Sequence, residues 1–493
     1  MSSLREQAAR GVKWTSLSTA LVVVIGIAQM AVLTRLLSRA DFGLMAMVTT
    51  VTGFAHIYAD MGLSNAIIQR KSPTRDQLST LYWTNILTGA VLFVVVVAVS
   101  PLIAGFYREP GLQVLVVASG LIFLITPLGQ QFQILLQKEL EFDRLARVEV
   151  SSAATGFVVA VAAAAAGLGV WALVIGILLQ SIARVIQLAA IGWRRWPPGR
   201  HFARVDLKGY LSFGLYQIGE RTIYYFAANI DYLLIGRYLG AEQLGVYTIA
   251  YQLVVIPVSR LNPILTKVAF PVFSRRQDDP AALRRGFGEL IELVALVTFP
   301  LLVGLAVVAP VAVPAIFGPN WQPSVELVQI LAVMGLLMCL SNPLGSALLA
   351  KGRADVGFWL NVANTAVVVP VLWVAVRWGT SAVAWGHTLI ALLLFLVELW
   401  IVYRILDMSW RSYLARLGRP TATTAAMGVA VAIAYLAIAG TDLRPVAQLI
   451  PLVVVGGLVY VAAWWVIARS YLRDLWRLLV KRTPKARAPE AGG

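Results

Sequence analysis

Ionisable side chains lie inside several long apolar segments of this sequence, and their spacing places them on shared helical faces. Between residues 209 and 235, Gln217, Glu220, Tyr224 and Asp231 follow one another at intervals of three, four and seven residues, and Arg221 lies beside them. An ionisable group at membrane depth is costly, so it is expected to face the interior of a helix bundle or a hydrated cavity. This stripe therefore predicts a polar path that binds charged ligands.

Polar stripes of the same kind occur in other apolar segments of both halves of the chain. One stripe in segment 42–60 contains Thr49, Gly53, His56 and Asp60, and one in segment 171–192 contains Gln180, Arg184 and Gln187. The candidate substrate-binding side chains are Gln29, Gln133, Arg184, Gln217, Arg221, Arg260, Asn262 and Lys267, and the candidate ion-coupling side chains are Asp60, Glu220 and Asp231. The cations outnumber the carboxylates in this set, so we expect a cationic cavity. Such a cavity suits an anion, and guanidinium groups suit phosphate through their paired donors.

Simpler interpretations stay open for single members of these stripes. A Gln, Ser or Thr side chain within a span often only bonds a neighbouring helix. Glu220 and Arg221 could form a local ion pair, and Asp60 and Lys267 could lie at a membrane face. His387 and Glu398 share one face of the segment 382–403, which fits packing near the interfaces as well as a proton relay.

The elements that must position these groups are membrane-spanning helices. The chain has 493 residues, of which 59% are hydrophobic and only 13% are charged. Its apolar runs are each ~20 residues long, the length that crosses the hydrocarbon core of a bilayer. We expect an all-α polytopic membrane protein with about 14 transmembrane helices. The expected spans are 14–33, 42–60, 81–105, 112–136, 148–168, 171–192, 209–235, 244–268, 290–317, 325–349, 357–376, 382–403, 421–440 and 445–468.

The net charge of +17 reflects orientation in the membrane and gives no sign of nucleic-acid binding. Of the 41 Lys and Arg residues, 31 fall on alternate loops and on the termini, and six fall on the other loops. This bias is the positive-inside rule. It predicts that both termini are cytoplasmic, that the number of spans is even, and that the basic residues face lipid headgroups.

An internal repeat divides the expected spans. Residues 35–43 (RLLSRADFG) align with residues 237–245 (RYLGAEQLG) at an offset of 202. We expect a six-helix lobe at 1–200, a second lobe at 201–406 related to it as a parallel repeat, two extra helices at 407–470, and a cytoplasmic amphipathic and basic tail at 471–493. Transporters built from repeats carry their substrate path between the repeats. The stretch 407–419 is expected to be a loop.

Enzyme signatures are missing from the sequence. We find no P-loop, no Ser–His–Asp pattern and no metal-ligand cluster, and the single cysteine, Cys339, lies inside an apolar run. No cofactor is expected. A membrane glycosyltransferase or polymerase would carry a large outer loop with catalytic carboxylates, which this chain lacks. A drug/cation antiporter would be expected to have an acidic cavity, and a scaffold protein would have little use for polar stripes.

Several short motifs resemble those of a known family. They are GVKW (11–14), LLSRADFG (36–43), DMGLS (60–64), AIIQRK (66–71), PLIAGFYREP (101–110), GVWAL (169–173), NIDYLLIG (229–236) and LGVY (244–247). In this order and spacing they resemble the Wzx-type exporters of the multidrug/oligosaccharidyl-lipid/polysaccharide superfamily, in the branch that serves colanic and teichuronic acids. The resemblance covers most of residues 1–470 and is dense to about residue 280.

The resemblance implies a flippase of the bacterial cytoplasmic (inner) membrane. Its substrate would be an oligosaccharide repeat unit linked to undecaprenyl pyrophosphate, moved from the inner to the outer leaflet by alternating access. The cationic cavity would then hold the pyrophosphate, and a Na⁺ or H⁺ gradient would drive transport. A polysaccharide polymerase and a chain-length regulator would be its protein partners. The sequence predicts neither the sugar composition nor the coupling ion nor the oligomeric state.

Overall fold

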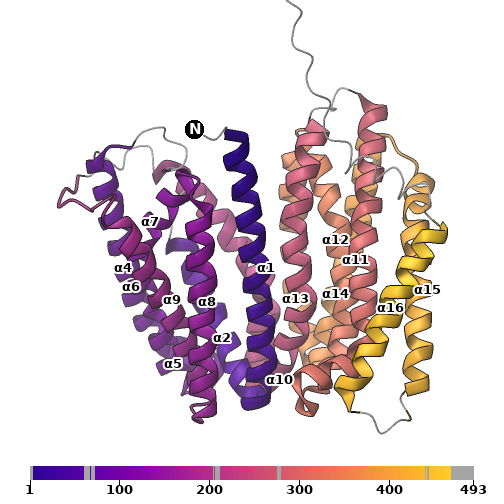
Figure 1. Cartoon of the computed structure of the whole chain (residues 1–493), viewed down its shortest axis with the longest axis horizontal. Coiled ribbons are helices and arrows are strands. Elements are labelled where there is room, and N and C mark those ends of the chain that lie inside the picture. Colours follow the sequence, from indigo (N-terminus) through magenta and orange to yellow (C-terminus); the bar gives the residue numbers. More distant parts are fainter. Residues whose placement is uncertain are drawn as a thin grey trace, which may run out of the picture. The chain divides into compact units, whose positions relative to one another are not determined.

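The apolar runs of the sequence form helices throughout the part of the chain that the computed structural model describes. These residues are 4–59, 67, 73–203, 205, 211–274, 279–438, 440 and 444–467. Their contacts divide the chain into two units (Figure 1), which we describe separately. Unit 1 comprises Met1–Gln252, Ile316–Leu327 and Asn361–Ile390, and unit 2 comprises Leu253–Ala315, Val328–Leu360 and Ala391–Gly493. The lobe boundaries expected at residues 200, 406 and 470 stay predictions.

The described residues from the start of unit 1 to the end of α10 form the following helices. They are α1 (Leu4–Leu36), α2 (Arg39–Ala59), α4 (Arg75–Tyr107), α5 (Leu112–Gly120), α6 (Ile122–Ile125), α7 (Pro127–Lys138), α8 (Phe142–Ala165), α9 (Trp171–Gly192) and α10 (Leu211–Ser274). Within it, α8 packs against both α1 and α9 (Figure 1). The remaining helices are α11 (Pro280–Phe317), η2 (Pro319–Trp321), α12 (Ser324–Ala350), α13 (Ala354–Ala375), η3 (Val376–Trp378), α14 (Thr380–Leu406), α15 (Trp410–Ile438) and α16 (Pro445–Ile467).

The expected membrane class is confirmed. Twelve of the described helices are long and apolar enough to cross a membrane, and a bent pair raises the number to 13. One of the twelve, in α10, is two helices joined at Gly240, whose backbone is not helical (φ 83°, ψ 178°). Dividing α10 there gives the fourteen expected segments.

The fourth expected span, 112–136, is broken where the sequence suggested one continuous helix. It consists of α5, α6 and α7, with a bend of 45° between Leu112–Ile125 and Pro127–Lys138. Pro127 has no amide hydrogen, so the carbonyl of Phe123 loses its normal helical partner. That carbonyl lies against Gly89 of α4, where an added Cβ would overlap it. The bend therefore follows from the proline and from the close approach of α4 that the glycine allows.

The two repeated segments contact each other in unit 1, and the contact is reciprocal. A Cβ added to Gly43 in α2 would overlap the carbonyl of Ala241, and a Cβ added to Gly245 would overlap the carbonyl of Arg39. These pairs correspond under the offset of 202 residues. Arg39 also forms an ion pair with Glu242 at 3.2 Å. The repeat thus places two glycines where two helices cross with their backbones in contact.

Two arginines on the loops with few cations bind helix ends. The Arg35 Nε donates to the carbonyl of Ile316 in the last turn of α11, at 3.2 Å. Arg237, its counterpart in the repeat, donates to the carbonyl of Phe106 in the last turn of α4. The last carbonyls of a helix lack partners within it and carry partial negative charge. These arginines therefore cap helix ends, which explains why they depart from the charge bias.

In unit 2, the start of α15 corrects an expectation. The stretch 407–419 was expected to be a loop, but α15 begins at Trp410. Arg416 and Arg419 from its first turns approach Glu292 of α11 at 3.4 and 3.8 Å, and the Glu292 side chain is only 2% exposed. Further along, the Tyr460 hydroxyl of α16 donates to the carbonyl of Leu296. Polar contacts to α11 therefore hold the two C-terminal helices in this unit.

Candidate functional site

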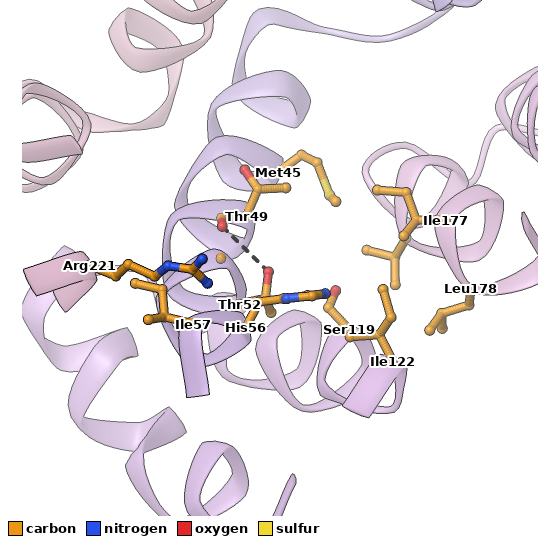
Figure 2. A pocket seen from close by; sticks show the side chains of 12 residues that line it. Met45, Thr49, Thr52, His56, Ile57, Ser119, Ile122, Ile177, Leu178 and Arg221 are labelled. Atoms are coloured by element: carbon orange, nitrogen blue, oxygen red, sulfur yellow. Dashed lines mark hydrogen bonds between the residues drawn. The ribbon is translucent and has the colours of Figure 1, made fainter. Parts of the chain in front are cut away.

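A cavity of about 540 Å³ opens in unit 1 among α2, α5, α6, α9 and α10 (Figure 2). Twelve residues line it: Met45, Thr49, Thr52, Gly53, His56, Ile57, Ser119, Ile122, Val174, Ile177, Leu178 and Arg221. Its volume lies in the range of small-molecule sites, ~300–1,000 Å³. Two features predicted from the sequence meet in it, namely the polar stripe of α2 and Arg221 of α10.

Arg221 is positioned by contacts between α10 and α2. The Tyr225 hydroxyl donates to the carbonyl of Thr50 at 2.9 Å, and the hydroxyls of Tyr58 and Thr222 lie 2.9 Å apart. Gly53 leaves room for the Tyr225 hydroxyl, which a Cβ would overlap. These contacts fix the turn of α10 that carries Arg221. Figure 2 shows the guanidinium pointing toward the polar face of α2.

The charge of the lining is cationic. Among the described residues that line the cavity, Arg221 and His56 are the two basic ones, and none is Asp or Glu. Within the described part of the chain, the Arg221 guanidinium has no hydrogen bond or ion pair, and its side chain is exposed. An exposed guanidinium with free donors can bind an oxyanion in two-point fashion.

The polar stripe of α9 faces a neighbouring helix and does not line the cavity. Arg184 lies 3.6 Å from Glu149 of α8, and both side chains are 38% exposed. The Ser151 hydroxyl donates to Gln187 at 2.7 Å. This arrangement follows the simpler reading of polar residues within spans, in which they join helices. The contact also involves the Glu149 carboxylate, which was not among the carboxylates that the sequence analysis compared with the cations of the expected cavity.

A second polar cluster surrounds Asp231 in the first half of α10. Its carboxylate is fully buried and accepts a 2.7 Å hydrogen bond from the Tyr247 hydroxyl, beyond the break at Gly240. The Nδ1 atom of His387 in α14 lies 3.6 Å from the same carboxylate. Tyr232 contacts the ring of Tyr247 edge-on. Asp231 is ten residues from Arg221, which is ~15 Å along a helix.

The other predicted site residues are placed as follows. Gln29 in α1 and Gln133 in α7 are half-buried, and neither lines the cavity. Asp60 lies outside the described residues. The side chains of Gln217, Glu220, Arg260, Asn262 and Lys267 also lie outside the described part of the chain.

Sequence reasoning missed residues whose role depends on another helix. Ile122, Ile177 and Leu178 line the cavity, but within an apolar span nothing distinguishes them from lipid-facing residues. His387 was grouped with Glu398 by spacing, whereas the structure sets it beside Asp231. Glu398 instead bonds Ser341 in unit 2. Among the described residues, no group of three or more His, Cys, Asp and Glu side chains could hold a metal ion.

Known proteins are similar to this chain in sequence or in fold. Residues 32–326 match a family model described as polysaccharide biosynthesis protein. The chain is 39% identical over 430 residues to the teichuronic acid biosynthesis protein TuaB of Bacillus subtilis (strain 168), covering 87% of this chain and 89% of TuaB. It is 35% identical over 420 residues to the lipopolysaccharide biosynthesis protein WzxC of Escherichia coli (strain K12), covering 85% of each.

Two solved structures have a similar fold. One is the lipid II flippase MurJ in an inward closed conformation, with a TM-score of 0.74 and 11% identity, covering 93% of this chain and 99% of MurJ. The other is an inward-facing multidrug transporter of the MATE family, with a TM-score of 0.61 and 15% identity, covering 81% of this chain and 99% of that one. At these identities the likeness is one of fold.

Proposed function

The chain belongs to the polysaccharide biosynthesis protein family, the Wzx-type exporters, and from this premise we propose that it is a flippase for a lipid-linked oligosaccharide. Members of this family are multi-pass membrane transporters of bacterial polysaccharide export and not enzymes. The proposed substrate is a repeat unit on undecaprenyl pyrophosphate, moved from the inner to the outer leaflet of the cytoplasmic membrane by alternating access.

The observation that carries this proposal is the charge of the cavity. A pyrophosphate bears its negative charge on several oxygens, which match the planar donors of a guanidinium. Arg221 offers such donors, and His56 lies in the same cavity. Arg184, Arg260 and Lys267 stay predicted contributors. A carrier of cationic drugs would need carboxylates in this lining, and the lining residues that the structure describes include none.

Transport in reconstituted vesicles tests the proposal. The wild-type protein should move a fluorescent undecaprenyl-pyrophosphate oligosaccharide to the opposite leaflet and should not move a cationic dye. Arg221→Ala should abolish this movement, as should Arg260→Ala, and Arg221→Lys should retain part of it. Arg147→Ala is a matched control, because Arg147 forms an exposed ion pair with Asp143 in α8. Wild-type flipping by both alanine variants, or movement of the dye alone, would refute the proposal.

Ion coupling is proposed to run through Asp231. A buried carboxylate with an imidazole and a tyrosine hydroxyl around it can change its net charge when a proton or a cation arrives. Asp231→Asn should abolish transport driven by an imposed H⁺ or Na⁺ gradient, and comparing the two gradients identifies the ion. Transport at the wild-type rate would remove Asp231 from the mechanism. Glu220 and Asp60 stay predicted coupling residues.

The orientation and the protein partners also belong to the proposal. The charge bias of the loops supports a cytoplasmic position for both termini. The single native cysteine, Cys339, is buried, so a cysteine added as Gly493→Cys can be labelled selectively. A membrane-impermeant maleimide should label it in inverted vesicles and not in intact cells. Co-purification with a polysaccharide polymerase and a chain-length regulator would test the expected partners.

A further inference from the structure

The cavity in unit 1 has two chemically different sides. Its polar groups are Thr49, Thr52 and His56 of α2 together with Arg221, and the apolar Met45 and Ile57 of α2 lie among them. Its apolar side consists of Ile122, Val174, Ile177 and Leu178 from α6 and α9. In Figure 2, Ile122, Ile177 and Leu178 lie across the cavity from Arg221, with His56 and Ser119 between them. A ligand that fills this space must therefore be an anion at one end and a hydrocarbon at the other.

Sugars fit this lining poorly. Each sugar hydroxyl that faces Ile122, Ile177 or Leu178 would lose its water without gaining a hydrogen bond, which is unfavourable. A cavity of about 540 Å³ also suits a ligand of drug size. It therefore takes one part of a lipid-linked oligosaccharide and not the whole molecule.

A buried hydroxyl on the broken fourth span provides a second, independent indication of a ligand. Leu121, between α5 and α6, keeps helical backbone angles, so Ser119 and Ile122 lie on one helical segment, which ends at the 45° bend before Pro127, and both line the cavity. Discontinuous spans in transporters are typical of substrate sites. The Ser119 hydroxyl is buried and has no hydrogen-bond partner among the described residues, and the residue is only 9% exposed. A hydroxyl can turn to donate to a phosphoryl oxygen.

We propose that this cavity holds the junction of the lipid carrier, that is, the pyrophosphate and the first isoprene units attached to it. This inference rests on the proposed flippase function and assigns one part of its substrate to one site. Arg221 and Ser119 bind the pyrophosphate oxygens, and Ile122, Ile177 and Leu178 contact the isoprene carbons. The oligosaccharide lies outside this cavity.

Binding to the purified full-length protein tests the assignment. The probes are geranyl diphosphate, inorganic pyrophosphate and a free oligosaccharide. Geranyl diphosphate should bind at least ~10-fold more tightly than pyrophosphate, because small differences in apolar contact change affinity by ~10–200-fold. The free oligosaccharide should not compete with it. Equal affinities for the two diphosphates, or competition by the oligosaccharide, would overturn the proposal.

Variants separate the two sides of the cavity. Ile177→Ser should weaken geranyl diphosphate ~10-fold and leave pyrophosphate binding unchanged, which also shows that the variant is folded. Arg221→Ala should weaken both probes. Ile186→Ser is the matched control, since Ile186 is on the same helix, is 61% exposed and does not line the cavity. Equal loss in Ile177→Ser and Ile186→Ser, or no loss in Ile177→Ser, would contradict the assignment.

A transport assay distinguishes failure of this inference from failure of the proposed function. If the wild-type protein flips the lipid-linked oligosaccharide and Ile177→Ser flips it equally well, the cavity does not hold the isoprene units although the flippase function stands. If the wild-type protein moves no lipid-linked oligosaccharide, the proposed function itself is wrong. The expected result is flipping by the wild-type protein and reduced flipping by Ile177→Ser.

Discussion

The reciprocal contact between the repeated segments leads to a prediction about stability. In Gly245→Ala, the new methyl group would overlap the carbonyl of Arg39. A backbone carbonyl cannot rotate aside as a side chain can, so α2 and the second half of α10 must separate. Adding a methylene-sized group to a well-packed contact costs ~1–3 kcal/mol. Gly43→Ala should have a similar cost, because it meets the carbonyl of Ala241 in the corresponding way.

A matched variant isolates this cost from helix propensity. Alanine is favoured over glycine inside a helix by ~1 kcal/mol, and this gain partly offsets the overlap in Gly245→Ala. Gly26→Ala makes the same exchange within α1, where nothing lies within 4 Å of the new Cβ. The difference between the two variants therefore measures the overlap alone. We expect Gly245→Ala to be less stable than Gly26→Ala by ~1–3 kcal/mol.

Thermal unfolding of the purified full-length protein measures this difference. At ~2.1 cal/mol/K of unfolding entropy per residue, a chain of 493 residues shifts by ~1 °C per kcal/mol. The apparent melting temperature of Gly245→Ala should therefore lie ~1–3 °C below that of Gly26→Ala. The double variant Gly43→Ala/Gly245→Ala should lose less than the sum of the single losses, since one separation of the helices relieves both overlaps. Equal melting temperatures for Gly245→Ala and Gly26→Ala would show that the close backbone contact does not exist.

Three further predictions concern polar contacts within the spans. Tyr247→Phe removes the donor to the buried Asp231 carboxylate. It should reduce gradient-driven transport and lower the free energy of unfolding by ~1–3 kcal/mol. An unchanged rate of gradient-driven transport together with an unchanged melting temperature would count against this contact. Arg416→Met should destabilise the protein more than Glu292→Gln does. It leaves the Glu292 carboxylate, which is 2% exposed, with only Arg419 at 3.8 Å, whereas in Glu292→Gln the two arginines can turn to water. The reverse order of melting temperatures would disprove this reasoning. Arg237→Leu should lower the melting temperature by freeing the last carbonyls of α4, whereas Arg147→Ala should not.

The broken fourth span shows a limit of prediction from periodicity. Composition alone gives a continuous apolar run at 112–136, and Pro127 gives a reason for a kink. The sequence does not reveal that Ser119 and Ile122, on the segment before this kink, line a cavity, because that depends on how α2 and α9 pack beside them. A similar limit applies to 407–419, whose many basic residues suggest a loop. There the carboxylate of Glu292, far away in sequence, binds arginines that lie on the first turns of a helix.

The sequence by itself determined the membrane class, the approximate number of spans and the family. A bilayer demands long apolar helices, and this requirement is met locally, within each segment. The tertiary structure decided which polar residues meet. Spacing assigned Arg184 and Arg221 equally to a cationic cavity, yet Arg184 lies beside Glu149 and Arg221 lines a cavity. Helical periodicity places residues on one face of a helix, but only the packing of that face against other helices determines its partners.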